Sequence, residues 1–398
     1  MSAPRLLDKF SGPQKARKEL LATGGDPTNV ILERILSPTE AIIDGRKTLL
    51  AGTNNYLGLT LYPECIAAGQ KALADFGTGT TGSRMASGSY TLHGALEAEL
   101  AEFYGLAHGL VFSTGYAANL GTLAALCGAG DNIMLDADAH ASLYDGCQLT
   151  GAEIFRFRHN DANDLDKRLR RLGERCGRTL VVVEGIYSML GDRAPLADIV
   201  AVKDRHGALL MVDEAHSLGV LGEHGRGQVE ADGVLSQADF IVGTFSKSLG
   251  ATGGFCVSNH AELTLFRYTS RPFIFTAAPC PSVVATTRAA LHCLRTRPQL
   301  RERLWENARR LYAAIKSIGY TVGPEVSPVV AIRVTAREQA LALWHAEMEQ
   351  GVYTNLVLPP ATPDGGSLLR CSVSAAHSPR QIDRISEVFA GLSGLVHG

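Results

Sequence analysis

The sequence predicts an α/β protein built around a mostly parallel β-sheet. Between about residues 60 and 280, short apolar runs alternate with helix-length stretches, which is typical of strands wrapped by helices. Several of these runs are apolar almost throughout, as expected for strands that are covered on both faces. The chain has 398 residues, of which 45% are hydrophobic and 20% charged, so it can bury a large core.

Residues 1–45 are expected to form an amphipathic helical arm, with Leu6 and Phe10 on its apolar face and Val30 and Ile35 continuing that face after the break at Pro27. Such an arm suits a lid, a dimer clasp or a simple strap. Residues 48–60, TLLAGTNNYLGLT, predict a short strand that runs into a polar turn.

Strands are predicted at 109–114, 132–137, 153–157, 180–185, 208–215, 239–245 and 253–259, with helices at 92–104, 116–127 and 196–205. A long helical stretch at 281–318 precedes a strand–helix–strand–helix pattern over 319–398. We therefore expect an N-terminal segment over 1–60, a large domain over 61–290 and a C-terminal α+β domain over 291–398.

Composition argues against several classes of protein. Thirty-eight basic and forty acidic residues give a net charge of −2, without the basic excess of nucleic-acid-binding proteins. We find no apolar run long enough to predict an integral membrane segment, and the charged N-terminus does not resemble a signal peptide. The eight cysteines form no CxxC pair, so we expect no metal site and buried thiols in a cytoplasmic protein.

Three groups at predicted strand ends have reactive character, and ligands bind at that edge of a parallel sheet. Lys247, in GTFSKSLGATGG, is surrounded by small uncharged residues, so it is either a loop lysine or an amine that forms a Schiff base. Asp213 ends a buried strand, which suits a cap, a salt bridge or a partner for a pyridine nitrogen. Gly115 and Tyr116 start a helix directly after a strand, so their free amides suit a phosphate.

In this chain order, the three groups describe a pyridoxal 5′-phosphate enzyme of fold type I, the aspartate-aminotransferase-like fold. That fold has a mostly parallel seven-stranded sheet in its large domain. The sequence has no GxGxxG after a strand and no GxxxxGK[ST], so neither a dinucleotide site nor a P-loop is supported.

The chain resembles the α-oxoamine synthase family nearly end to end, and within it the soluble bacterial serine palmitoyltransferases. The matching motifs are NNYLGL (54–59), GTGTTGSRMASGSYTLHGALEAELAEFYG (77–105), FSTGYAAN (112–119), DADAHASLYDG (136–146), EGIYSMLGD (184–192), VDEAHSLG (212–219), GTFSKSLGATGGF (243–255), RPFIFTAA (271–278) and PPATP with LLRCSVSAAH (359–377). The resemblance implies a homodimer with its sites at the interface.

By matching position, the resemblance also implies residue roles. Lys247 would bind the cofactor covalently and move the substrate α-proton, Asp213 would pair with the pyridinium nitrogen, and His140 would stack over the ring and reach the substrate carboxylate. His216 would hydrogen-bond the phenolic oxygen of the ring, with Ser188 nearby. The remaining implied contacts are Gly115, Tyr116, Thr244, Ser246 and Thr276 of the partner subunit to the phosphate, with Arg370 on the substrate carboxylate and Asn55 at the edge of the site.

The implied reaction condenses L-serine with a long-chain acyl thioester and gives 3-oxosphinganine, CO2 and free thiol. An 8-amino-7-oxononanoate synthase, which uses alanine and a pimeloyl thioester, shares these residues, and glycine-using members are a third alternative. A regulator or chaperone that only carries the cofactor is disfavoured by the retained Lys247, Asp213 and His140. Peripheral membrane association is left open because the product is hydrophobic.

One position departs from the family pattern. Where related enzymes usually have an arginine before the PP[AT]xP segment, this chain has Leu358. Because leucine cannot bind a carboxylate, we expect Arg370 and His140 to provide more of that contact. Alternatively, Leu358 widens the entrance for the acyl chain.

Overall fold

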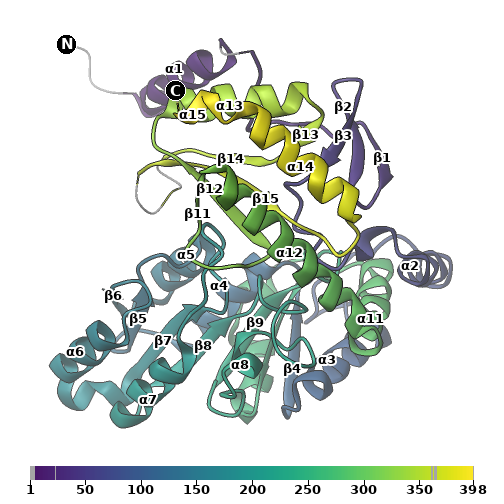
Figure 1. Ribbon diagram of the computed structural model, residues 1–398. Helices are drawn as coiled ribbons and strands as arrows, with labels where there is room; N and C mark the ends of the chain where they lie inside the picture. Colours follow the sequence, from purple (N-terminus) through teal and green to yellow (C-terminus); the bar gives the residue numbers. More distant parts are fainter. Residues whose placement is uncertain (1–4, 23, 360–361, 363–364, 398) are drawn as a thin grey trace.

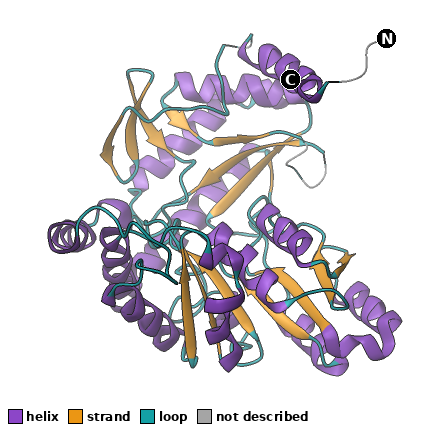
Figure 2. Cartoon of the chain, turned by 180° about the vertical axis from the view of Figure 1, so that it is seen from behind, coloured by secondary structure: helices purple, strands orange, loops and turns teal. Residues whose placement is uncertain are grey.

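The computed structural model describes residues 5–22, 24–359, 362 and 365–397. A large sheet wrapped by helices forms one part of the molecule, and a smaller sheet with its own helices lies beside it together with the N-terminal segment (Figure 1). Viewed from behind, the strands form separate groups with helices packed around each (Figure 2). Among the described residues, no helix is long and apolar enough to cross a membrane.

The large sheet has seven strands in the order β4-β10-β9-β8-β7-β5-β6. Their bounds are β4 (His108–Phe112), β5 (Asn132–Asp136), β6 (Glu153–Phe157), β7 (Thr179–Glu184), β8 (Leu209–Asp213), β9 (Phe240–Thr244) and β10 (Gly254–Ser258). Strands β6, β5, β7, β8 and β9 are parallel, whereas β10 is antiparallel to both its neighbours. The predicted mostly parallel sheet and its strands are confirmed.

Both faces of this sheet are covered. Along β7, Val181 and Val183 belong to one apolar cluster, while Leu180 and Val182 belong to another. Because successive side chains of a strand point to opposite faces, the continuous apolar run reflects helices on both sides. The helices of this part of the molecule are α2 (Pro63–Phe76), α3 (Thr91–Tyr104), α4 (Gly115–Leu126), α5 (Ala141–Thr150), α6 (Ala162–Leu172), α7 (Leu196–His206) and the short α8 (Gln228–Ala231), α9 (Phe266–Thr269) and α10 (Arg271–Ile274).

The N-terminal segment is only partly helical. A 3-10 turn, η1 (Leu6–Phe10), and α1 (Ser11–Leu21) precede a meander of β1 (Arg34–Ser37), β2 (Glu40–Ile43) and β3 (Arg46–Leu50), beside which β13 (Val352–Tyr353) pairs. The predicted helical face through Val30 and Ile35 is therefore wrong. In β2, buried and half-buried residues alternate, which is the period of a strand, and Asp44 and Gly45 both adopt positive φ in the tight hairpin.

The C-terminal part begins with two helices, α11 (Pro281–Thr296) and α12 (Pro298–Ile318). We expected one helical stretch here, but Pro298 excludes the helical conformation at Arg297, which has φ −131° and ψ 66°. Next come β11 (Thr321–Val322), β12 (Val329–Val334), α13 (Arg337–Glu349), β14 (Asn355–Val357), β15 (Ser367–Ser372), α14 (Pro379–Leu392) and α15 (Gly394–His397). The second sheet has the order β11-β12-β15-β14. The domain boundaries at 60 and 290 stay predictions.

Candidate active site

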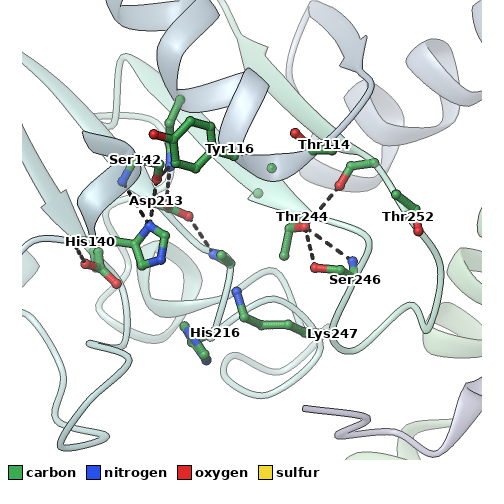
Figure 3. A pocket seen from close by; sticks show the side chains of 16 residues that line it. Thr114, Tyr116, His140, Ser142, Asp213, His216, Thr244, Ser246, Lys247 and Thr252 are labelled. Carbon is green, nitrogen blue, oxygen red and sulfur yellow. Dashed lines mark hydrogen bonds between the residues drawn. The ribbon is translucent and has the colours of Figure 1, made fainter. Parts of the chain in front are cut away.

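A cavity of about 330 Å3 lies where β8 and β9 end and α4 begins (Figure 3). It is lined by Thr114, Gly115, Tyr116, Asn119, His140, Ser142, Glu184, Asp213, Ala215, His216, Gly243, Thr244, Ser246, Lys247, Thr252 and Gly253. The structure thus brings together eight residues singled out in the sequence, from segments far apart in the chain. We did not expect Asn119, Ser142, Glu184 or Thr252.

Lys247 extends into this cavity from the loop between β9 and β10 (Figure 3). Two antiparallel strands hold the ends of the loop, and a turn that includes Gly250 at φ +61° closes it, with Gly250 N donating to Lys247 O at 3.0 Å. Burial lowers the pKa of Lys247 to about 8, although the nearby carboxylates of Asp213 and Glu184 oppose that shift. A buried amine that deprotonates this easily suits covalent chemistry better than a structural salt bridge.

Asp213 ends β8 with its carboxylate buried and doubly hydrogen-bonded. Asn119 Nδ2 donates to Asp213 Oδ2 at 2.7 Å, and Ala215 N donates to Asp213 Oδ1 at 2.9 Å. Asn119 also donates to Ser142 Oγ at 2.9 Å. Asn119 was therefore a missed site residue, although it lies one helical turn after Gly115 and so on the same side of α4.

The start of α4 approaches β9 very closely. A Cβ built on Gly115 would lie 2.7 Å from Thr244 Cβ, so only glycine allows this contact. Beside it, Thr244 Oγ1 and Ser246 Oγ are 2.8 Å apart, and Tyr116 is exposed. Free helix amides next to two hydroxyl groups suit a bound phosphate.

Two histidines face the cavity. Burial lowers the pKa of His140 below its ordinary value, and His140 Nδ1 lies 2.7 Å from Ser142 Oγ. Burial also holds the pKa of His216 well below its ordinary value, and the Lys247 and Arg370 cations add to this shift. Both imidazoles are therefore neutral near pH 7, so they are free to stack or hydrogen-bond without adding positive charge.

Glu184 and Tyr56 hold these histidines in place. The backbone N of His140 donates to Glu184 Oε1 at 2.5 Å, and burial raises the pKa of Glu184 well above its ordinary value. Tyr56 OH lies 2.8 Å from His216 Nδ1. Neither residue was given a role from the sequence, because their partners are more than forty positions away.

Arg370 lies on β15 of the second sheet and approaches Tyr56. Its Nε donates to Ser188 O at 2.6 Å, and one terminal nitrogen donates to Asn54 Oδ1 at 3.0 Å and to Ser372 Oγ at 3.1 Å. The other terminal nitrogen makes a 3.5 Å contact with Tyr56 OH. Ser188 thus contacts Arg370 through its carbonyl and is not among the described residues that line the cavity.

The remaining expected residues lie around the site. Asn55 is buried, and its Nδ2 donates to Thr60 Oγ1 at 2.8 Å. Thr276 is partly exposed on the turn after α10, and Leu358 is partly exposed just after β14. Of the residues that the structure describes, these three do not belong to the cavity lining.

The groups that line the cavity fit pyridoxal 5′-phosphate. The phosphate needs amide and hydroxyl donors, which Gly115, Thr244 and Ser246 offer where no side chain fits at the helix start. The pyridine nitrogen needs a fixed carboxylate, which Asp213 offers, and the aldehyde needs an amine such as Lys247.

Comparisons with known proteins agree with this geometry. Residues 46–389 match the family described as aminotransferase class I and II. The chain is 54% identical over 384 residues to a serine palmitoyltransferase from Caulobacter vibrioides, covering 96% of this chain and 95% of the relative. An 8-amino-7-oxononanoate synthase from Pelobacter propionicus is 40% identical over 347 residues, covering 87% and 88%.

A solved structure of SPT with a PLP internal aldimine superposes with a TM-score of 0.96 at 50% identity, covering 99% of this chain and 100% of the other. The expected fold type is thereby confirmed, as is the expected pyridoxal phosphate. The chain belongs to the aminotransferase class I and II family of α/β proteins, within a group of relatives named serine palmitoyltransferase.

Proposed function

We propose that the protein condenses L-serine with a long-chain acyl thioester, releasing CO2 and free thiol and forming 3-oxosphinganine. The observation that supports this most strongly is a cavity holding Lys247, Asp213 and His216 in a chain that is 54% identical to a serine palmitoyltransferase. The alternative, 8-amino-7-oxononanoate synthesis, has support at lower identity, 40–42%.

The cofactor would be held by Gly115, Tyr116, Thr244 and Ser246 at its phosphate and by Asp213 at its ring nitrogen. When bound, pyridoxal phosphate accepts the electron pair left at the substrate Cα by loss of a proton or of CO2. Asn119 and Ala215 N each donate a hydrogen bond to the Asp213 carboxylate and so would hold it in place opposite that nitrogen. Thr276 of the partner subunit would complete the phosphate contacts.

Lys247 would remove and return the proton at the substrate Cα. With its pKa near 8, about one Lys247 amine in ten is neutral at pH 7 and can accept a proton. Neutral His140 would cover the ring and help hold the substrate carboxylate, because a neutral imidazole can both stack and donate a hydrogen bond. His216, held by Tyr56, would donate to the phenolic oxygen.

We assign the substrate carboxylate to Arg370. Its Nε and one terminal nitrogen are already engaged with protein oxygens at 2.6–3.1 Å. The other terminal nitrogen has a long 3.5 Å contact with Tyr56 OH and is the most available donor. Asn55 precedes Tyr56 in the chain and has a buried Oδ1 with no hydrogen-bond partner among the described residues.

The substrate assignment can be tested with the holoenzyme. L-serine, L-alanine and glycine are added in turn, and the absorbance of the bound cofactor is followed. We expect serine to perturb the spectrum at the lowest concentration and to give 3-oxosphinganine when palmitoyl-CoA is added. Saturation by alanine alone, with product only from pimeloyl-CoA, would favour the alternative.

We also propose a homodimer with the site at the interface. The turn with Thr276 carries Phe275, a residue that is 72% exposed, and Tyr268 on α9 is 68% exposed. Large exposed apolar side chains near a binding site suit a protein interface. Sedimentation should give a dimer, and a fully active monomer would refute this proposal. The cysteines of the described residues are free thiols, which suits the proposed cytoplasmic location.

A further inference from the structure

His159 lies between two buried carboxylates outside the cavity. Its Nδ1 is 2.9 Å from Asp136 Oδ1, and its Nε2 is 2.6 Å from Asp192 Oδ2. Asp136 is fully buried and Asp192 nearly so. An ionised carboxylate only accepts hydrogen bonds, so both ring nitrogens must donate and the ring is an imidazolium. Burial alone would lower the pKa of His159, but the two carboxylates outweigh it and raise the pKa to about 10.

The other groups around the ring support this charge state. Asp138 Oδ2 lies 4.0 Å from His159 Nδ1, and the ring meets Tyr187 edge-on at a centroid distance of 4.4 Å. Asn160 donates through its backbone N to Asp136 Oδ2 at 3.0 Å and through Nδ2 to Asp192 Oδ2 at 3.1 Å. The imidazolium is therefore the cation that holds these carboxylates close to one another, with Asn160 adding neutral donors.

The two carboxylates belong to different segments of the site. Asp136 ends β5, and the segment that follows it leads directly to His140 at the start of α5. Asp136 Oδ1 also accepts from Asp138 N at 2.9 Å, which fixes the first turn of that segment.

Asp192 belongs to the turn after β7. Asp192 O accepts from Tyr187 N at 2.8 Å, and the carbonyl of Ser188 in the same turn accepts from Arg370 Nε at 2.6 Å. His159 thus joins the segment that leads to His140 and the turn that orients Arg370.

We propose that His159 is a positioning residue for the amino-acid substrate, joining through its ring the two segments that place His140 and Arg370. This inference rests on the proposed function, in which those two residues hold the substrate carboxylate. His159 touches neither cofactor nor substrate, so its replacement should alter substrate affinity more than cofactor binding.

The test compares four variants of the holoenzyme: H159Q, D192N, the double variant and the control H206Q. His206 is a suitable control because it also pairs with an aspartate, Asp166 at 2.9 Å, and its side chain is similarly buried. It lies at the end of α7, at the edge of the sheet opposite the cavity.

For H159Q we expect the KM for serine to rise by about tenfold or more. The rise should stay below about 100-fold, which is the size of effect that a 1 Å misplacement can cause. The cofactor absorbance should be unchanged, and kcat should fall less than KM rises. H206Q should match the wild type. In the double variant, removal of one carboxylate charge should reverse part of the KM increase seen in H159Q, because fewer buried charges are then uncompensated.

Several results would overturn the inference. One is a wild-type KM in H159Q. Another is a parallel loss of bound cofactor and of kcat together with the rise in KM, which would indicate a merely structural role. A double variant worse than both single variants would refute the charge argument. If H159Q does not fold, D192N still keeps the Asp136 contact and must raise KM.

Failure of the proposed function has a different signature. If wild type does not use serine, the same variants are compared with the amino acid that it does use. The same criteria then apply to that KM.

Discussion

The contact between Gly115 and Thr244 allows a sharp test of the phosphate site. In Gly115→Ala, the new Cβ would lie 2.7 Å from Thr244 Cβ and 2.8 Å from Thr244 Oγ1, closer than carbon atoms in proteins pack. The Thr244 Cβ cannot rotate away because the backbone of a buried strand fixes it. Overpacking of this kind costs about 1–3 kcal/mol, so we expect the start of α4 to move away from β9.

This displacement should weaken cofactor binding. A hydrogen bond to a charged group contributes about 1.5–3 kcal/mol, so losing one amide contact to the phosphate should raise the Kd about 10- to 150-fold. The cofactor is removed by dialysis against hydroxylamine, and pyridoxal phosphate is then titrated back while its absorbance is followed. Thermal unfolding of the cofactor-free proteins measures the packing cost separately.

Gly94→Ala is the matched control. Gly94 lies in the first turns of α3, is exposed, and would place its Cβ with nothing within 4 Å. Alanine there should leave the Kd unchanged and stabilise the protein by up to about 1 kcal/mol. Equal cofactor affinity in the two variants would show that the phosphate does not bind at the start of α4.

Further predictions concern the amine, the carboxylate contact and pH. Lys247→Ala should lose the absorbance of the covalently bound cofactor and nearly all turnover; an intact band would refute its role. Arg370→Ala should nearly abolish serine binding in a spectral titration, and unchanged binding would refute the assignment of the substrate carboxylate to Arg370. Leu358→Arg should preserve turnover and tighten serine binding. Because folding raises the pKa of His159 from 6.5 to about 10, its contribution to stability is complete below pH 6.5 and is lost as pH rises toward 10. Denaturant unfolding should show that loss in the wild type, and its persistence in H159Q would contradict it.

Local patterns predicted the large sheet well. Strands such as β7 are apolar on both faces, and that signal does not depend on distant residues. Over Val30–Ile35 the apolar spacing predicts a helix, but the pairing of β1 with β2 and the tight turn at Asp44–Gly45 determine the structure there. The apolar spacing also continues across Pro298, where the proline divides the predicted stretch 281–318 into α11 and α12.

The site was predicted only in part, because a local pattern locates residues at strand ends but does not show which distant residues they contact. Lys247, Asp213 and Gly115 stand at strand ends, which a pattern can locate. The contacts of Asn119 with Asp213 and of Tyr56 with His216 join residues from separate elements. Only the folded chain brings those partners together, so composition and spacing could not identify them.

The two sheets give the site two levels of resistance to opening. The proposed cofactor contacts come from the ends of β8 and β9. The residues of these strands are almost all buried in the middle of the large sheet, where amide hydrogens exchange slowest. Arg370 comes from the smaller sheet, which has four strands and its own helices. A partial opening of the smaller sheet would therefore release the substrate carboxylate while the cofactor stays bound, so gentle heating should first produce a holoenzyme that no longer recognises its amino acid.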